Sequence, residues 1–273
     1  MPNQPAENRS VGESEIPGID AAFDLTDRVA VVTGASRGIG RAVAIGLAQA
    51  GASVVAAART TEAIAATVDQ IHDDGGTGLP VTADVTDRDS VRRLFEQTAD
   101  EFGGVDVLVN NAGVNPENAL GKPETIEIEG FDQTVAVNLR GALLCAMEGA
   151  DFLAESDSGS LINIASVGGL VALPRQHPYV ASKHGLVGIT KSMAIDWAPS
   201  IRVNSIAPGY VETEFIEEAL ESESIRESLL RQTPLDRFAE PAEIAGPAVF
   251  LASDAGSYVT GTCVSVDGGW TAR

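Results

Sequence analysis

The chain has 273 residues, 44% of them hydrophobic, which is enough to bury the core of one large α/β domain or two small ones. Its net charge of −21 argues against nucleic-acid binding, because a phosphate backbone would be repelled and no stripe of Lys and Arg offsets the acid. The two cysteines, Cys145 and Cys263, lie in apolar runs, so we expect buried packing residues rather than disulfides or a metal site.

No stretch of about 18 apolar residues predicts a membrane span, and the N-terminus lacks the features of a signal peptide. We therefore expect a cytoplasmic protein. Only three of the 18 Lys and Arg residues are lysines, namely Lys122, Lys183 and Lys191. This acidic, lysine-poor composition favours a halophilic protein, since salt screens the self-repulsion of an acidic surface; an ordinary acidic protein is the alternative.

Residues 1–22 are polar and aperiodic, which indicates a flexible N-terminal extension before a catalytic domain at 23–273. Beyond them, short apolar runs alternate with segments of helical pattern. Strands are predicted at Val29–Val32, Ser53–Ala57, Gly78–Val81, Val105–Val109, Ser160–Ile164, Arg202–Ile206 and Cys263–Val266. Helices are predicted at 39–50, 61–73, 88–102, 131–154, 179–197, 222–231 and 241–252. The alternation predicts a single-domain, Rossmann-type, doubly wound parallel sheet with helices on both faces and ligands at the carboxyl ends of its strands.

The first predicted strand runs into a glycine-rich turn, and a helix follows. The turn reads Thr33-Gly34-Ala35-Ser36-Arg37-Gly38-Ile39-Gly40. Glycines let backbone approach a pyrophosphate closely, and the helix N-terminus adds free N–H groups and a favourable dipole. A purely structural turn is the alternative, but the position between strand and helix favours a dinucleotide site.

The end of the second predicted strand, Ala56-Ala57-Ala58-Arg59-Thr60, carries no acidic residue for a ribose 2′-hydroxyl. Arg59 instead suits a 2′-phosphate, and Arg37 can approach it from the glycine turn. The sequence therefore predicts NADP(H) as the cofactor, with NAD(H) as the alternative and two solvated arginines as the simpler interpretation.

Three motifs together resemble the short-chain dehydrogenase/reductase family: the glycine turn, Asn110-Asn111-Ala112-Gly113, and Tyr179-x-x-x-Lys183. The resemblance covers about residues 24–273. It implies that Asp84-Val85 borders the adenine and that Asn110, Asn111, Ala112 and Gly113 lie on the adenosine side of the cofactor. It also implies that Pro208-Gly209-x-Val211-x-Thr213 contacts the nicotinamide carboxamide.

The spacing of Tyr179 and Lys183 places both on one face of a helix. A free tyrosine has a pKa of about 10, and a nearby ammonium favours the phenolate, so the pair can serve as general acid or base. Ser166, which follows the strand Ser160–Ile164, can hydrogen-bond the substrate oxygen. Asn138 matches the fourth position of the family, where a mid-helix Asn with a distorted backbone holds a water in a proton relay. The family thus implies hydride transfer between the nicotinamide and a carbonyl or carbinol carbon.

The substrate is less clearly indicated. The acid-rich stretch Glu212–Leu235 is expected to close the pocket as a mobile lid. Resemblance at the C-terminus to gluconate and deoxygluconate dehydrogenases favours a sugar, polyol or sugar acid, whose carboxylate Arg175 and His177 could bind. A 3-oxoacyl reductase acting on acyl carrier protein or coenzyme A is the alternative, and a non-catalytic NADP(H) sensor is a third. The resemblance also implies a homotetramer, with helices at 131–154 and 179–197 packed across a dyad.

Overall fold

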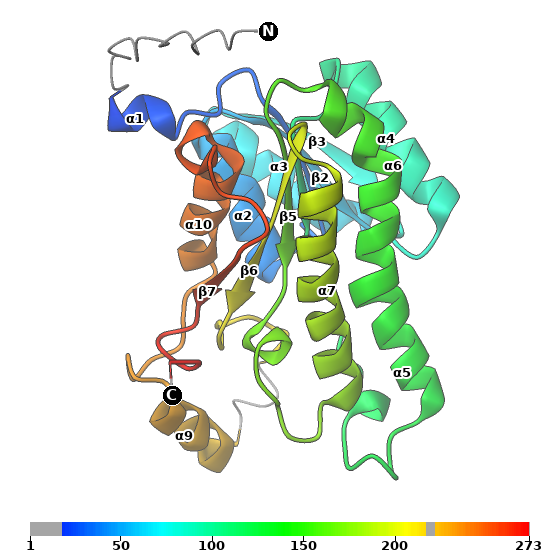
Figure 1. Cartoon of the computed structure of the whole chain (residues 1–273), viewed down its shortest axis with the longest axis vertical. Coiled ribbons are helices and arrows are strands. Elements are labelled where there is room, and N and C mark those ends of the chain that lie inside the picture. Colours follow the sequence, from blue (N-terminus) through cyan, green and yellow to red (C-terminus); the bar gives the residue numbers. More distant parts are fainter. Residues whose placement is uncertain (1–17, 217–221, 273) are drawn as a thin grey trace, which may run out of the picture.

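A seven-stranded, wholly parallel sheet forms the centre of the molecule, in a computed structural model that describes residues 18–216 and 222–272 (Figure 1). The strand order is β3-β2-β1-β4-β5-β6-β7, so the chain winds outward in both directions from β1. The strands are β1 Val29–Thr33, β2 Ser53–Ala58, β3 Thr77–Thr82, β4 Val107–Asn110, β5 Gly159–Ile164, β6 Ile201–Pro208 and β7 Cys263–Val266. The predicted doubly wound Rossmann-type fold is confirmed.

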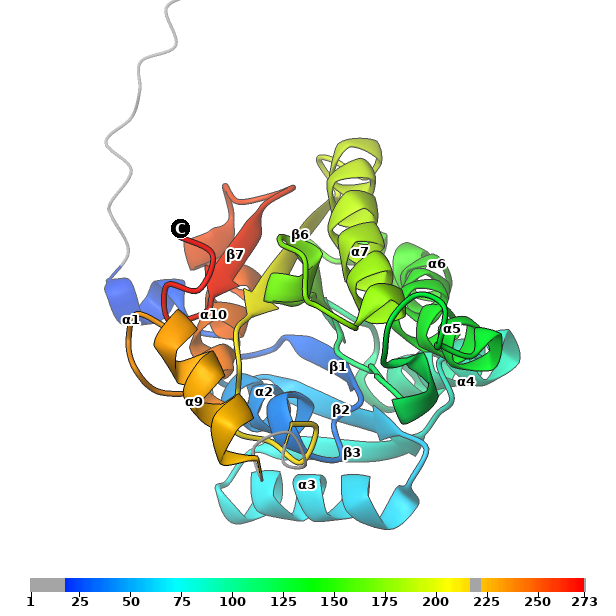
Figure 2. The same ribbon diagram turned by 90° about the horizontal axis from the view of Figure 1, so that it is seen from below.

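Helices cover both faces of the sheet (Figure 2). On one face α2 lies between α3 and α10, and on the other α4, α6 and α7 lie side by side. The helices are α1 Ile19–Ala22, α2 Gly38–Gln49, α3 Thr61–Asp73, α4 Arg88–Phe102, α5 Ile128–Val135, α6 Ala142–Glu155, α7 His177–Asp196, α9 Glu223–Gln232 and α10 Ala242–Ala252.

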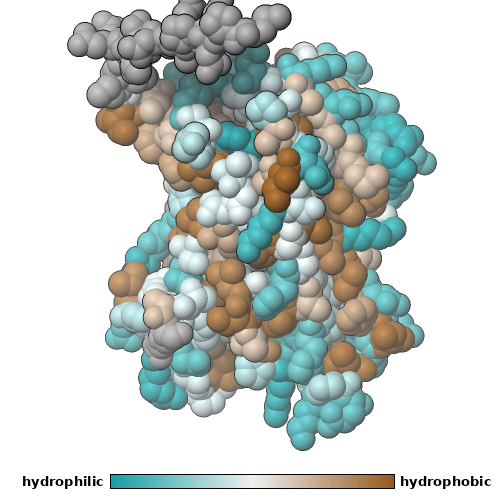
Figure 3. All heavy atoms as spheres, viewed as in Figure 1, coloured by the Kyte–Doolittle hydropathy of each residue, from teal (hydrophilic) through white to brown (hydrophobic). Residues whose placement is uncertain are grey.

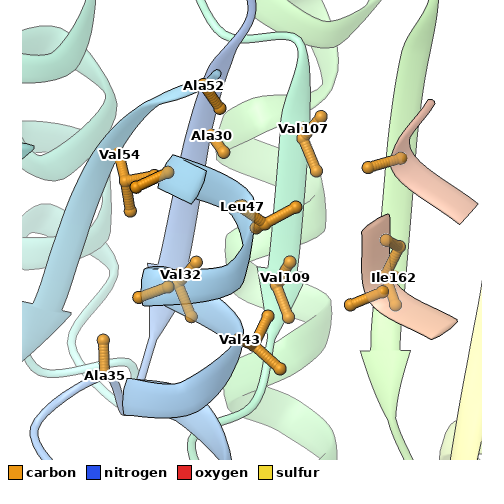
Figure 4. Packing of buried hydrophobic residues seen from close by; sticks show 14 of the residues in the cluster. Ala30, Val32, Ala35, Val43, Leu47, Ala52, Val54, Val107, Val109 and Ile162 are labelled. Carbon is orange, nitrogen blue, oxygen red and sulfur yellow. The ribbon is translucent and has the colours of Figure 1, made fainter. Parts of the chain in front are cut away.

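Each face of the sheet has its own hydrophobic core. Alternate residues of β1 point to opposite faces, so that Val32 joins the core under α2 and Val31 joins the core under α4 and α6. In the first core, Val43 and Leu47 of α2 pack over the central strands (Figure 4). Burial on both faces explains why the strands are continuous apolar runs without alternation.

Three expectations from the sequence differ from the structure by more than a small shift of an element's ends. The predicted helix 131–154 is interrupted by a π-helical turn at Ala136–Gly141, which separates α5 from α6. The predicted extension 1–22 lies mostly outside the described residues, but its last residues form the single turn α1, whose side chains are not buried. Cys145 is fully buried as expected, whereas Cys263 is only half-buried because β7 is an edge strand.

No helix among the described residues is both long and apolar enough to cross a membrane. On the face seen in Figure 1, hydrophobic residues occur in small groups broken up by hydrophilic ones (Figure 3). The strands run downward in Figure 1, so their carboxyl ends meet at the lower edge, beside the first turn of α7 and near α9.

Candidate active site

The turn between β1 and α2 is built of backbone, with glycines where side chains do not fit. Gly34 and Gly38 have φ of +65° and +52°, values that residues with a side chain rarely adopt. A Cβ at Gly34 would lie 2.8 Å from Asn111 Nδ2, and one at Gly40 would overlap the Gly34 carbonyl oxygen. Arg37 precedes α2 without a side-chain cap, so the first N–H groups of the helix remain available for a ligand.

Residues after β4 hold this turn in place. The Asn111 backbone N–H donates to Thr33 Oγ1 at 3.0 Å, and its Nδ2 donates to the carbonyl oxygens of Thr33 at 3.0 Å and Gly34 at 3.1 Å. The Ala112 N–H also donates to Thr33 Oγ1, at 3.2 Å. The predicted residues Asn111 and Ala112 therefore lie beside the glycine turn, and the Asn111 side chain serves to support it.

Asn110 is buried beneath the site. Its Nδ2 donates to the Ala142 carbonyl oxygen and to Asn163 Oδ1, both at 3.0 Å. Asn163 Nδ2 in turn donates to Thr190 Oγ1 at 2.9 Å. Asn110 was expected beside the cofactor, but these bonds show a supporting side chain that ties β4 and β5 to α6 and α7.

Arg59 and Asp84 follow the neighbouring strands β2 and β3. Asp84 Oδ1 accepts hydrogen bonds from the Thr86 N–H at 2.9 Å and the Thr86 hydroxyl at 2.7 Å. Burial tends to raise the pKa of the Asp84 carboxyl, but these bonds and the positive charge of Arg59 outweigh it, so the pKa lies below its ordinary value. Arg59 is exposed and forms no ion pair within the described part of the chain.

The segment after β6 lies directly on the glycine turn. A Cβ at Gly38 would come within 3.1 Å of Thr213 Cγ2, and Arg37 Nε lies 3.8 Å from Glu214 Oε2. The predicted cofactor residues Arg37, Gly38 and Thr213 thus lie close together although they are far apart in the sequence. The other predicted cofactor residues lie at the same edge of the sheet. They are Ser36 in the glycine turn, Ile39 in the first turn of α2, Val85 after β3, Gly113 after β4, and Pro208, Gly209 and Val211 at and after the end of β6.

Ser166, Tyr179 and Lys183 lie together at the end of β5 and on α7. Lys183 is only 4% exposed, and its Nζ donates to the Ile164 carbonyl oxygen at 2.7 Å. The same Nζ lies 5.7 Å from the centroid of the Tyr179 ring. Ser166 hydrogen-bonds the Tyr179 hydroxyl, and its Oγ also accepts the Gly168 N–H at 3.0 Å. The three side chains predicted for proton chemistry therefore form one cluster.

Asn138 lies in the π-helical turn and is 1% exposed. Its Oδ1 accepts from the Val114 N–H at 2.8 Å, and its Nδ2 donates to the Val114 carbonyl oxygen at 2.9 Å and to Ser182 Oγ at 3.2 Å. Ser182 Oγ donates to the Tyr179 carbonyl oxygen at 2.7 Å. The backbone distortion expected at Asn138 is present, and the side chain links the segment after β4 to α7.

Burial controls the titration of both central groups. It lowers the pKa of Lys183 to about 8, because the ammonium loses its hydration. Burial raises the pKa of Tyr179, and the hydrogen bond to Ser166 offsets only part of that increase. In the chain alone the pKa of Tyr179 is therefore raised by burial, and the predicted lowering by Lys183 is not part of this shift.

Arg175 and His177 are exposed at the start of α7, and the described residues form no ion pair with either. Arg175 has φ of +62°, unusual for a residue with a side chain, and its carbonyl oxygen accepts the Gly121 N–H at 2.9 Å. The structure brings both residues to the rim of the cluster without assigning their side chains a contact.

Aromatic residues that the sequence analysis missed surround Tyr179. The Phe215 ring lies 6.1 Å from the Tyr179 ring, and Tyr210 packs on Trp270 at 4.9 Å. Burial raises the pKa of Tyr210 to about 12, and the nearby Tyr179 contributes a smaller part of that increase. A cavity of about 90 Å³ lies between Tyr210, Leu235 and the end of β7. The position of Tyr210 directly after Pro208-Gly209 was the available signal.

A second missed pair joins the segment after β4 to the start of α7. Asn115 Nδ2 donates to Gln176 Oε1 at 3.1 Å. Gln176 precedes Tyr179 by three residues, which was the signal in the sequence. Among the described residues, no group of three or more His, Cys, Asp or Glu side chains could hold a metal ion.

Comparisons with known proteins show which family the chain belongs to. A family model described as enoyl-(acyl carrier protein) reductase matches residues 34–271. A 3-oxoacyl-(acyl-carrier-protein) reductase of Thermotoga maritima is 38% identical over 246 residues, which are 90% of this chain and 98% of that protein. A 2-dehydro-3-deoxy-D-gluconate 5-dehydrogenase of Escherichia coli is 38% identical over 258 residues, or 93% of this chain and 99% of that protein.

A comparison with solved structures gives the same result as the comparison of sequences. A gluconate 5-dehydrogenase from Burkholderia cenocepacia, in complex with NADP and tartrate, superposes with a TM-score of 0.88 at 34% identity, covering 93% of this chain and 99% of that one. The chain therefore belongs to the short-chain dehydrogenase/reductase family of oxidoreductases.

The burial of Lys183 predicts a directly measurable titration. Because the chain has three lysines, isotope-labelled lysine gives three side-chain signals, and one of them should titrate with a pKa of about 8 in the ligand-free protein. The unfolded chain holds this proton more tightly, so Lys183 should make the free energy of unfolding rise as the pH increases from about 8 to 10.5. The shifted signal should be missing from Lys183→Met, and a Lys183 signal titrating at 10.5 would contradict the burial argument.

Proposed function

We propose that the chain catalyses the NADP(H)-dependent interconversion of a ketone and a secondary alcohol. The observation that carries this proposal is the cluster of Ser166, Tyr179 and Lys183 next to the glycine turn. A Cβ at Gly113 would lie 3.8 Å from Lys183 Nζ, and the preceding Ala112 bonds to the end of β1. Groups able to move a proton and a cradle for a dinucleotide thus share one edge of the sheet.

The cradle fits a dinucleotide because its glycines leave backbone N–H groups uncovered at the start of α2. We assign the pyrophosphate to the turn 34–40, and the adenine to Asp84 and Val85. Asn111, Ala112 and Gly113 would border the adenosine, and Pro208, Gly209, Val211 and Thr213 the nicotinamide carboxamide. Bound NADP(H) would supply the hydride.

Side chains at the end of β5 and on α7 would carry out the proton chemistry. In the proposed reaction the Tyr179 hydroxyl gives or takes the proton of the substrate oxygen, while Ser166 orients that oxygen. An ammonium has three donors, and Lys183 Nζ uses one on Ile164, which leaves two for the ribose hydroxyls. Asn138 holds the segment after β4 against α7, as its bonds to Val114 and Ser182 allow.

Tyr179→Phe should abolish turnover and leave NADPH binding largely intact. The variant loses the proton-transferring hydroxyl, a group worth about a hundredfold or more in rate, but keeps the ring that packs against Phe215. Steady-state kinetics and a fluorescence titration of NADPH provide the two measurements. Tyr258→Phe is the matched control, since Tyr258 is fully exposed. Near-normal activity of Tyr179→Phe would exclude the mechanism.

Arg59→Gln should weaken NADPH binding by about tenfold or more, because a charge-assisted bond to the 2′-phosphate is lost. Binding of NADH, which lacks that phosphate, should change little. Titrating both cofactors against the wild type and the variant gives the four dissociation constants. Arg93→Gln on the exposed face of α4 removes the same charge elsewhere and serves as the control. Equal loss for both cofactors would contradict a 2′-phosphate site at Arg59.

For the substrate we propose a sugar, polyol or sugar acid. Support comes from the relatives named as a deoxygluconate and a gluconate dehydrogenase, the latter in complex with tartrate, a hydroxy acid. Arg175 and His177, both exposed at the start of α7, are the residues proposed to meet a substrate carboxylate. They precede Tyr179 by four and two residues.

A 3-oxoacyl thioester is the second candidate, favoured by the identity to the Thermotoga maritima reductase. An acidic carrier protein requires a basic docking patch, and the chain has a net charge of −21. Two cations near the site are also paired, since Arg37 faces Glu214 and Arg237 Nη1 lies 2.6 Å from Glu243 Oε2. Arg59 and Arg175 form no ion pair within the described part of the chain. The net charge and the two ion pairs favour a small substrate over a protein-bound one.

A substrate screen with both cofactors at low and high salt tests these proposals. Turnover of gluconate or a polyol with NADP⁺ is the expected result, together with higher activity and thermal stability at high salt if the acidic surface is halophilic. Exclusive turnover of 3-oxoacyl thioesters would favour the second candidate. Tight NADPH binding without any turnover would favour a non-catalytic sensor.

We further propose a cytoplasmic homotetramer. The apolar side chains of Leu143 and Met147 on α6 are 37% and 48% exposed, and Ile195 on α7 is 79% exposed. Burying them against a second copy would remove this apolar surface from water. Light scattering that gives the mass of one chain would contradict the assembly, and recovery of the protein outside the cytoplasm would contradict the location.

A further inference from the structure

Glu214 places a carboxylate beside an arginine that is expected to bind phosphate. Its Oε2 lies 3.8 Å from Arg37 Nε, and its side chain forms no other ion pair or hydrogen bond within residues 18–216 and 222–272. The next residue along the chain, Phe215, has its ring 6.1 Å from the Tyr179 ring. The segment that carries this acid therefore lies along the edge where the cofactor and the substrate would meet.

Both members of the pair are exposed to solvent. The Arg37 side chain is 73% exposed and the Glu214 side chain is 57% exposed. A separation of 3.8 Å is too long for a hydrogen bond, so the two groups attract each other by charge without a fixed geometry. Exposed pairs of this kind are weak, whereas a phosphate can bind a guanidinium through two parallel hydrogen bonds. A phosphate in reach of Arg37 would therefore displace Glu214.

The second arginine of the predicted phosphate site has a different acidic neighbour. The positive charge of Arg59 acts on Asp84, but the Asp84 carboxylate accepts hydrogen bonds from the N–H and the hydroxyl of Thr86 at 2.9 and 2.7 Å. Asp84 is thus satisfied without an ion pair to Arg59. Glu214 has no such bonds among the described residues, so a phosphate that recruits Arg37 leaves the Glu214 carboxylate without its partner.

We propose that Glu214 competes with the 2′-phosphate of NADP(H) for Arg37 and thereby sets how strongly the chain prefers NADP(H) to NAD(H). The carboxylate weakens binding of the phosphorylated cofactor, because the phosphate must draw Arg37 away from it. NAD(H) lacks this phosphate and leaves the pair intact. The inference rests on the proposed cofactor site and goes beyond it, since Glu214 moderates a preference that Arg37 and Arg59 alone would make stronger.

Glu214→Gln tests the competition, because it removes the charge and keeps the size of the side chain. The dissociation constant of NADPH should fall by about two- to fivefold, the range that an exposed ion pair spans. The dissociation constant of NADH should change by less than about 1.5-fold, since no phosphate competes for Arg37. Fluorescence titration of both cofactors measures these constants without any turnover.

Glu212→Gln is the matched control for this variant. It removes the same charge two residues earlier, and the Glu212 side chain is exposed and forms no ion pair in the described ranges. Thermal denaturation verifies that each variant is folded. The gain of Glu214→Gln over Glu212→Gln should shrink as NaCl is added, because salt screens exposed charges. A gain that is independent of salt would show a change in the shape of the segment and would overturn the competition.

Arg37→Gln separates competition for the arginine from direct repulsion of the phosphate. Without the guanidinium there is nothing to share, so Glu214→Gln added to Arg37→Gln should change the dissociation constant of NADPH no more than Glu212→Gln does. An equal gain in both backgrounds would show that the Glu214 carboxylate acts on the phosphate directly, and would contradict the role proposed for the pair.

The outcomes separate this inference from the proposed function. If the wild type binds NADPH no more tightly than NADH, the proposed 2′-phosphate site is overturned and this inference with it. If the wild type prefers NADPH, but Glu214→Gln leaves the ratio of the two dissociation constants unchanged or lowers the preference, only the role of Glu214 is overturned.

Discussion

The ammonium group of Lys183 is held out of water against the carbonyl oxygen of Ile164, 2.7 Å away. That contact fixes the end of β5 to the middle of α7, and so places Tyr179 one helical turn from Lys183 and in reach of Ser166. Removing a charge from water is unfavourable, and this cost of desolvation lowers the pKa of Lys183 to about 8. The site therefore keeps a cation where packing alone would select an apolar side chain.

Supporting bonds converge on the same place from the neighbouring strands. Asn111 fixes the glycine turn to the end of β4, and Asn110 ties β4 to Asn163 of β5. Asn138 then joins the next segment of chain to α7 through Ser182. Short polar side chains thus connect the dinucleotide cradle to the proton-transferring cluster, so that neither can shift without disturbing the other.

The sheet was predictable because its strands are buried on both faces and are therefore visible as apolar runs between turns. The glycine turn and the Tyr179–Lys183 spacing were predictable because each is a local pattern of a few residues. Contacts between residues distant in sequence were not predictable. Gln176 and Asn115, for example, are 61 residues apart and are brought into contact only by the tertiary fold. For the same reason the sequence assigned Arg37 to the cofactor without showing that Glu214 faces it. The sign of the Tyr179 shift depends on burial, which no motif records.

The π-helical turn at Ala136–Gly141 also sets the phase of the helix that follows it. Each residue of an α-helix advances about 100° around the axis, so the wider turn offsets α6 from α5 by roughly that angle. With this offset α5 faces α7, while α6 buries Cys145, Ala146 and Leu153 in the core it shares with α4. An uninterrupted α-helix could make only one of these two contacts, either that with α7 or that with the core shared with α4. The irregularity that seats Asn138 is therefore also what closes the second core, and a one-residue deletion there would misalign both.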